Sequence, residues 1–386
     1  MLNISPQQYY AKGARLGIDQ ETLNNARNSI IKIQGINPSL YPLLTLNHLA
    51  VQCGLPYYYL RSIVERKLDE YKHFHLKKRL PGRNNKRLIS VPSSDLLRCQ
   101  KWITANILSV VPTHDCSYAY APNSSPVFAA QVHTQSSWMV KVDIQDFFTS
   151  VSEHRVYQVF RSLGYSKLLS LELSRICTAV HNSKCNPDKL VKYGKNSIQK
   201  YQNPHSGFLP QGAPTSPMLS NLVVRELDND LQQLSKNVNM RFTRYADDIV
   251  FSCTEKREYG DIISVKDKML HLINKNGFQP NQRKTVIRGP GKRKIVLGML
   301  VDGSHPRLPK EYKDMLRLHL YYLSHSNFGP SIHADARSTS VSKMFHYVRG
   351  MIFWSISVEP EYGEKLLAQF NAIDWPPIDW PETVEE

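Results

Sequence analysis

Paired cysteines are missing from this chain. Its six cysteines are widely spaced, and no two of them stand in a Cys-x-x-Cys pair. That spacing excludes the usual zinc-binding and redox motifs, and a disulfide framework is not expected in a chain of 386 residues. No apolar run approaches membrane-spanning length, and the N-terminus lacks an apolar signal segment. We therefore predict reduced thiols in a cytoplasmic protein that has no membrane partner.

Acidic residues are also scarce relative to basic ones. The chain has 49 Lys and Arg against 33 Asp and Glu, which gives a formal net charge of +16. Such an excess favours a polyanionic partner, although a generically basic surface would give the same total. The basic residues are spread along the chain, as expected for a long channel that binds a polyanion and not for a basic tail. There is no internal repeat or low-complexity linker, and the length suits two or three domains.

The most informative stretch is residues 241–252, RFTRYADDIVFS. Aromatic and β-branched residues on both sides of a short turn predict a β-hairpin, with Asp247 and Asp248 at its tip. Adjacent carboxylates repel each other, and a divalent cation removes that cost. An ordinary Asp-rich turn is the more common explanation of a lone pair, so a metal site requires a third carboxylate.

Asp143 supplies that third carboxylate. The run WMVKVD at 138–143 alternates cleanly, which predicts a strand that ends at Asp143, on the face opposite Trp138, Val140 and Val142. Asp143 and the 247–248 turn are far apart in the sequence, so only a sheet would bring them together. By itself, Asp143 fits a helix cap equally well.

Several further segments have clear patterns. Residues 1–74 read as helical, 77–92 as a basic hairpin, 208–217 as a rigid turn before a helix, 265–273 as a helix, 294–301 as one strand, and the last hundred residues as helical. Residues 181–206 read as an exposed, basic insertion. His133 would either contact nucleic acid or bridge two loops.

In combination, these motifs resemble those of the reverse transcriptases, and among them the bacterial retron type. The resemblance rests on the order of the basic hairpin, DIQDFF at 143–148, QGAPTSP at 211–217 and YADD at 245–248, and it covers residues 75–355. Two retron signatures differ here. AAQVH at 129–133 lacks the usual asparagine, and VLG at 296–298 replaces Val-Thr-Gly.

The resemblance implies an α+β right-hand polymerase fold, with fingers, a palm built on an antiparallel sheet, and a helical thumb. The implied parts are an N-terminal helical region at 1–74, fingers at 75–135, palm at 136–290, thumb at 291–375 and a tail at 376–386.

It also implies roles for individual residues. Asp143, Asp247 and Asp248 match the catalytic carboxylates, which would bind two Mg²⁺ ions (or Mn²⁺ as a substitute) together with the carbonyl of Ile144. The residues matched to the incoming nucleotide are Lys86, Arg87, Phe148, Gln211, Gly212 and Lys284, with Phe148 as the aromatic that excludes a 2′-hydroxyl. The residues assigned to nucleic acid are His133, Tyr245, Val296, Leu297, Gly298, Lys313 and Arg317.

The implied activity is RNA-directed DNA polymerisation by two-metal phosphoryl transfer. A retron enzyme would copy a cognate structured non-coding RNA into single-stranded DNA, using dNTPs and priming from an RNA 2′-hydroxyl. The branched RNA–DNA product (msDNA), a separate effector protein, host RNase H and a role in antiviral defence against phage all follow by analogy.

Other functions fit parts of the pattern. One alternative is a non-retron defence-associated or group II intron-like reverse transcriptase. Another is a non-catalytic RNA-binding scaffold, which the complete carboxylate set disfavours. An RNA-dependent RNA polymerase is disfavoured by Phe148.

Overall fold

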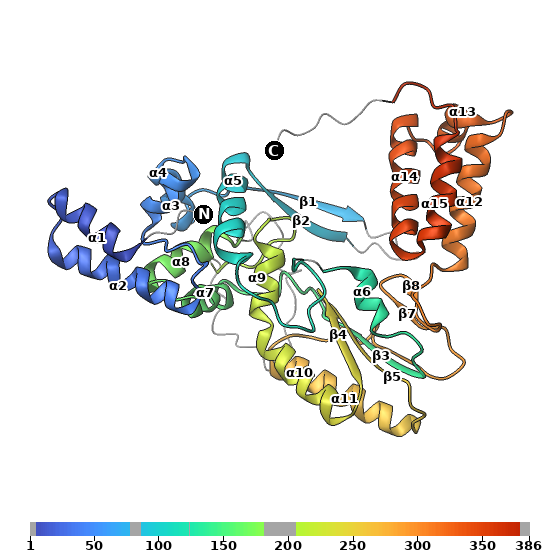
Figure 1. Cartoon of the computed structure of the whole chain (residues 1–386), viewed down its shortest axis with the longest axis horizontal. Coiled ribbons are helices and arrows are strands. Elements are labelled where there is room, and N and C mark those ends of the chain that lie inside the picture. The colour runs from blue at the N-terminus through green and yellow to red at the C-terminus, as the bar shows by residue number, and fades with distance from the viewer. Residues whose placement is uncertain (1–4, 78–85, 123, 181–205, 379–386) are drawn as a thin grey trace.

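The computed structural model describes residues 5–77, 86–122, 124–180 and 206–378. Figure 1 shows a small sheet near the centre, a helical N-terminal part on one side and a separate group of C-terminal helices on the other. No helix in the described segments is long and apolar enough to cross a bilayer.

The N-terminal part consists of short helices with recognisable starts. Side chains of Ser5, Asp19 and Thr45 accept hydrogen bonds from the first turns of three of these helices, as N-caps do. The helices are α1 (Pro6–Arg15), α2 (Gln20–Ile36), α3 (Leu46–Cys53) and α4 (Tyr57–Val64). Leucines of α3 and α4 belong to the same hydrophobic core as the central sheet. The division of the chain at residue 74 therefore does not separate two cores, and the predicted domain boundaries stay predictions.

The basic hairpin comes next. Strands β1 (Tyr71–Lys77) and β2 (Lys86–Pro92) pair antiparallel, with Leu76 opposite Arg87. Ser93 caps the following helix, and its side chain accepts a hydrogen bond from the Leu96 N–H. That helix is α5 (Ser94–Ile103), and it continues into a π-helical turn, η1 (Thr104–Leu108), before α6 (Pro126–Gln131).

The central sheet has four antiparallel strands in the order β4-β5-β3-β6. They are β3 (Trp138–Asp143), β4 (Arg241–Tyr245), β5 (Asp248–Cys253) and β6 (Val286–Arg288). The hairpin at 241–252 and the strand ending at Asp143 are therefore confirmed. The sheet is buried on both faces: Val140 and Val142 join the main core, while Met139 packs with the C-terminal segment.

Helices cover the sheet and connect it to the hairpin. They are α7 (Glu153–Ser162), α8 (Lys167–Ile176), α9 (Ser216–Val223), α10 (Arg225–Asn237) and α11 (Tyr259–Lys275). In Figure 1, α10 and α11 run side by side beneath the sheet. Helix α11 is longer at both ends than the predicted 265–273.

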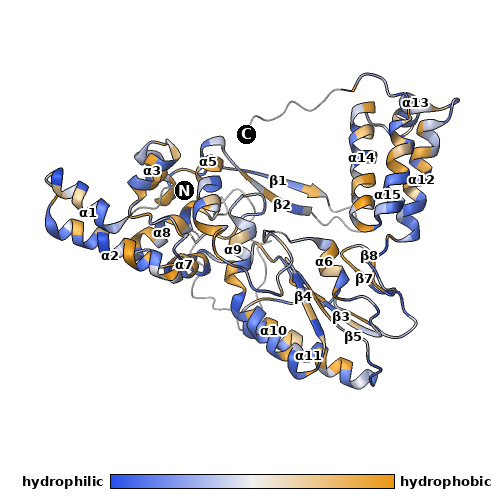
Figure 2. Ribbon diagram, viewed as in Figure 1, coloured by the Kyte–Doolittle hydropathy of each residue, from blue (hydrophilic) through white to orange (hydrophobic). Residues whose placement is uncertain are grey.

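The C-terminal helices have a hydrophobic core of their own, which includes Leu316, Leu320, Val348, Ile352 and Phe370. They are α12 (Lys310–Ser324), α13 (Gly329–Asp335), α14 (Val341–Val358) and α15 (Pro360–Asn371). Figure 2 shows polar and apolar residues on each of these helices, as expected for helices that bury one side against one another.

The prediction of one strand at 294–301 is wrong. This segment is a hairpin of two very short strands, β7 (Ile295–Val296) and β8 (Met299–Leu300). Leu297 and Gly298 form its turn with φ of 49° and 85°, so both residues are left-handed and reverse the chain.

Candidate active site

The three predicted carboxylates lie at one end of the central sheet. Asp143 is the last residue of β3 and pairs directly with Asp248, the first residue of β5. Asp247 stands in the turn before β5, and its carbonyl accepts a hydrogen bond from the Ile144 N–H at 3.0 Å. Ala246, immediately before Asp247, has a left-handed φ of 55°. Strand pairing and this tight turn therefore bring residues from two distant segments together.

Cationic and amide side chains hold two of these carboxylates. Lys284 Nζ lies 2.7 Å from Asp143 Oδ2, and Asn281 Nδ2 donates to Asp143 Oδ1 at 3.2 Å. Lys141 Nζ lies 3.0 Å from Asp248 Oδ2. Burial opposes the charge of Lys284, but the hydrogen bond and the negative charge of Asp143 give a net raised pKa. Lys284 is therefore a protonated cation at the carboxylate cluster.

Asp247 stands in an unfavourable electrostatic environment for a carboxylate. Burial, followed by the charges of Asp143 and Asp248, raises its pKa from 3.8 to about 6. A divalent cation would relieve this repulsion. Carboxylate oxygens are the ligands that Mg²⁺ prefers, so the donor set fits the predicted metal.

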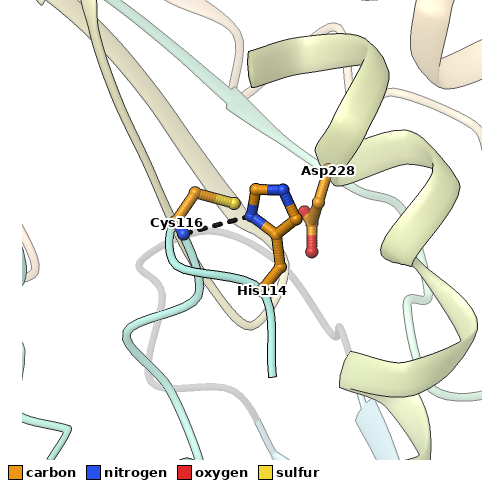
Figure 3. Close-up of side chains that lie close together, drawn as sticks. All are labelled: His114, Cys116 and Asp228. Atoms are coloured by element: carbon orange, nitrogen blue, oxygen red, sulfur yellow. Dashed lines mark hydrogen bonds between the residues drawn. The ribbon is translucent and has the colours of Figure 1, made fainter. Parts of the chain in front are cut away.

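Another group of side chains has ligand atoms that lie closer together than those of the three carboxylates. In the described part of the chain, only His114, Cys116 and Asp228 have three ligand atoms all within 4.8 Å of one another (Figure 3). Both oxygens of Asp228 already accept from Arg244, at 2.6 and 2.7 Å, and both residues are fully buried. Burial, followed by the charge of Asp228, raises the pKa of the Cys116 thiol. We interpret this group as part of a buried hydrogen-bonded network.

Gly212 lies directly against the basic hairpin of β1 and β2. The carbonyl of Gln211 accepts from the Ser90 N–H at 2.8 Å, which joins the turn to β2. Gly212 has φ of 125°, and a Cβ at this position would stand 2.9 Å from the Ser90 carbonyl oxygen. Both the backbone conformation and the close approach require glycine.

We expect Gly212→Ala to destabilise the protein by about 1–3 kcal/mol, because the strained backbone conformation and the contact with Ser90 both resist a side chain. Urea denaturation and primer extension would measure the effect. Gly350→Ala is the matched control, since nothing lies within 4 Å of a Cβ there and the position is helical. Equal stability of Gly212→Ala and the wild type would contradict this account of the turn.

Phe148 and its neighbours lie beside the carboxylates. The half-buried Phe148 ring stands 5.6 Å from the Phe147 ring and 6.2 Å from the Tyr120 ring, measured between centroids. Burial, followed by the negative charge of Asp247, raises the pKa of Tyr120, which places this tyrosine near the catalytic turn. Arg87 is exposed on β2, and its charge also acts on Tyr120. Phe148 and Arg87, both predicted to contact the nucleotide, are thus linked to the catalytic turn through Tyr120.

The comparison with known families decides the identity. Residues 76–300 match the family described as reverse transcriptase (RNA-dependent DNA polymerase). The chain belongs to the reverse transcriptase family. The right-hand polymerase fold and the RNA-directed DNA polymerase activity, both predicted from the motifs, are confirmed by this match.

Curated relatives of this reverse transcriptase are of retron type, as predicted. It is 25% identical over 315 residues to the Retron Ec86 reverse transcriptase of Escherichia coli, covering 82% of this chain and 85% of the relative. It is 29% identical over 297 residues to the Escherichia coli Retron Ec73 enzyme, covering 75% and 84%. Over 322 residues it is 26% identical to the Myxococcus xanthus Retron Mx162 enzyme, covering 80% and 62%.

A more distant likeness exists to the solved structure of telomerase from Candida albicans in complex with a fragment of telomeric RNA. It has 10% identity and a TM-score of 0.39, and it covers 80% of this chain and 67% of the telomerase.

His133 does not lie on a nucleic-acid surface of the reverse transcriptase. Its ring is fully buried, 2.7 Å from the Ser252 hydroxyl and 2.7 Å from the Thr243 hydroxyl. Burial, with a smaller effect of Arg241, lowers its pKa to about 3, so the ring is neutral. The prediction of nucleic-acid contact is therefore wrong for His133. The alternative prediction, that His133 bridges two segments, agrees better with the structure. The histidine joins strands β4 and β5, however, and not two loops.

The other residues assigned to nucleic acid are placed differently from one another. Tyr245 is half-buried at the end of β4, and the Leu297–Gly298 turn is accessible at the tip of its hairpin. The Val296 side chain is buried, so it cannot contact a primer directly. Their predicted roles otherwise stay predictions.

Lys313 and Arg317 are engaged within the C-terminal helices. Lys313 Nζ lies 2.5 Å from Glu359 Oε2 and 4.7 Å from the centroid of the Tyr362 ring. The exposed Arg317 lies 5.6 Å from the same ring and 3.4 Å from Asp314. A nucleic acid would have to compete with these partners, most strongly at Lys313.

Some predicted features lie outside the described residues. These are the side chain of Lys86 and nearly all of the basic insertion predicted at 181–206.

Sequence reasoning missed Lys141, Asn281, Tyr120 and Arg244. A signal existed for Lys141, which alternates onto the same face of β3 as Asp143. Arg244 offered a weaker one, as a cation in the strand that leads directly to the carboxylate turn.

Proposed function

We propose that this reverse transcriptase is a retron enzyme that copies a cognate structured non-coding RNA into single-stranded DNA, starting from a 2′-hydroxyl within that RNA. The observation that carries the polymerase chemistry is the pairing of Asp143 with Asp248 beside Asp247, whose pKa is raised to about 6. The retron assignment is supported by the curated relatives.

The three carboxylates and the carbonyl of Ile144 would hold two Mg²⁺ ions, with Mn²⁺ as a substitute. When bound, such ions make the attacking hydroxyl more acidic and stabilise charge on the leaving pyrophosphate. Lys284, protonated and 2.7 Å from Asp143, places a cation where a triphosphate would approach. Lys141 orients Asp248 from the neighbouring strand. Catalysis would then depend mainly on positioning and charge.

The substrate side of the proposal follows from the residues around this site. Arg87, Gln211 and Gly212 would bind the dNTP, and Phe148 would exclude ribonucleotides. By analogy with retrons, the product would be a branched RNA–DNA molecule in the cytoplasm, trimmed by host RNase H. A separate effector protein would act with the complex in defence against phage.

The deciding experiment is purification of the protein from its native genomic context, followed by sequencing of the nucleic acid that copurifies. Samples would be digested separately with RNase and DNase. The Asp247→Ala, Asp248→Ala double variant is the inactive control. We expect discrete single-stranded DNA joined to RNA in the wild type and not in the control.

Other products would point elsewhere. Unbranched DNA that depends on the carboxylates would indicate a non-retron defence-associated enzyme. RNA alone in both samples would contradict the proposal and favour the scaffold.

A further inference from the structure

Arg244 is a buried cation in the catalytic hairpin. It lies in β4, yet its side chain is 0% exposed. A guanidinium in such a place requires a counter-charge and partners for its N–H groups. Asp228 of α10, also 0% exposed, supplies the charge by accepting from Nε and Nη2 at 2.6 and 2.7 Å.

The remaining guanidinium nitrogen reaches the catalytic turn. Arg244 Nη1 donates to the carbonyl of Ala246 at 3.2 Å and to Asn221 Oδ1 at 3.1 Å. Ala246 is left-handed, a conformation that costs energy for a residue with a side chain. Its φ and ψ set the direction in which the chain delivers Asp247 and Asp248. The guanidinium therefore binds the strained residue on which the orientation of both carboxylates depends.

The surroundings of Arg244 fix its own position. Its backbone N–H donates to the carbonyl of Cys116 at 2.8 Å, and its carbonyl accepts from the backbone N–H of Tyr118 at 2.9 Å. Asn221 of α9 accepts from Arg244 and donates through Nδ2 to the carbonyl of Ala119 at 2.7 Å. Helices α9 and α10 thus bind the guanidinium through Asn221 and Asp228, and the 116–119 segment holds the Arg244 backbone and the Asn221 amide.

We propose that Arg244, anchored by Asp228, is a positioning residue for the polymerase reaction: it fixes the backbone of Ala246 so that Asp247 and Asp248 face Asp143. An ion pair needed only for stability would be complete with Asp228 alone. The contact with Ala246 adds a connection to the catalytic turn. The inference deepens the proposed function, since it concerns the polymerase step on which that function rests.

The test separates positioning from folding by removing both charges together. Buried ion pairs can often be replaced by apolar residues without loss of stability, so Asp228→Leu with Arg244→Met is expected to fold. We expect its single-turnover rate of extending a DNA primer on an RNA template to fall about tenfold to 100-fold, because small misplacements of catalytic groups cost that much. Affinity for primer–template should be unchanged.

A second readout does not depend on turnover. Mn²⁺ titration followed by electron paramagnetic resonance, on the protein with primer–template, should show weaker binding in the double variant. Arg244→Lys is the conservative variant: it keeps a charge beside Asp228 but cannot also reach the Ala246 carbonyl. It should fold and show the same two losses, which keeps the test decisive if the double variant is unstable.

The matched control is another largely buried ion pair, Arg66 with Glu153, at 2.5 Å. Arg66→Met with Glu153→Gln should leave the rate per folded molecule and Mn²⁺ binding unchanged, whatever its effect on the melting temperature. If a folded Arg244 variant extended the primer at the wild-type rate and bound Mn²⁺ with the wild-type affinity, the inference would be overturned. A wild type that extends no primer would instead contradict the proposed function.

Discussion

Asp247→Asn is expected to abolish DNA synthesis while making the fold more stable at neutral pH. The loss of activity follows because one negatively charged oxygen ligand of the proposed metal site is removed. Metal-ion stabilisation is worth several kcal/mol, so a loss of about 10³-fold or more is expected in primer extension. The gain in stability follows from the raised pKa of Asp247.

The size of the stability change depends on pH. The Asp247 carboxyl has a pKa of about 6 in the folded protein and an ordinary value of 3.8, so ionisation opposes folding. The penalty is absent below about pH 4, grows between the two pKa values and levels off above about pH 6, where it approaches about 3 kcal/mol. Asparagine carries no charge, so the variant should gain stability over the wild type across that range.

Urea denaturation in the presence of a chelator, at about pH 4 and about pH 8, would measure this difference. Mg²⁺ should then stabilise the wild type more than the variant, since a ligand that binds only the folded state shifts the equilibrium towards it. Asp146→Asn is the matched control, because this carboxylate is exposed, lies three residues after Asp143 and is not one of the three proposed ligands, so the substitution should change neither property. Full polymerase activity in Asp247→Asn would contradict the assignment of the catalytic carboxylates.

Phe148→Ala is expected to let the enzyme incorporate ribonucleotides. The ring lies beside Phe147 and Tyr120 near the catalytic turn, and removing it would open space where a 2′-hydroxyl would otherwise be excluded. We expect the preference for deoxynucleotides to fall by about tenfold to 100-fold, the range in which pocket shape discriminates similar substrates.

The measurement is the ratio of single-nucleotide incorporation rates for a dNTP and the matching rNTP. Phe147→Leu is the control: Phe147 is buried in the main core, so its truncation should reduce stability without changing that ratio. Unchanged discrimination in Phe148→Ala would show that another group acts as the sugar gate.

The alternation of residue types along the sequence was sufficient to predict the strand ends that carry the three carboxylates. The alternation of 138–143 places Asp143 at the end of a strand, and the β-prone runs around 247–248 allow only a hairpin with the carboxylates at its turn. Both follow from the two-residue period of a strand. The pairing of Asp143 with Asp248 then required the resemblance to a family, because periodicity does not specify which strands become neighbours.

Sequence patterns did not predict which polar residues are buried. His133 and Arg244 are of residue types that are usually at least partly exposed, yet tertiary packing encloses both. The hydrogen-bond partners of His133 are more than 100 residues away in the sequence, and Asp228, the partner of Arg244, is 16 residues away. The 294–301 segment was misread for a local reason. Its apolar residues fit a strand, but Leu297 adopts a left-handed conformation that sequence alone rarely indicates outside glycine and asparagine.

The C-terminal helices have their own hydrophobic core, whereas the N-terminal helices share theirs with the sheet. This difference has an evolutionary consequence. We expect substitutions within the C-terminal core and substitutions around the carboxylates to change the free energy of unfolding nearly additively, because the two sets of residues have few common neighbours. The C-terminal helices, which contain Lys313 and Arg317 of the residues assigned to nucleic acid, could therefore diversify towards new RNAs while the chemistry stays constant. Changes in the N-terminal helices would be constrained by the stability of the catalytic sheet.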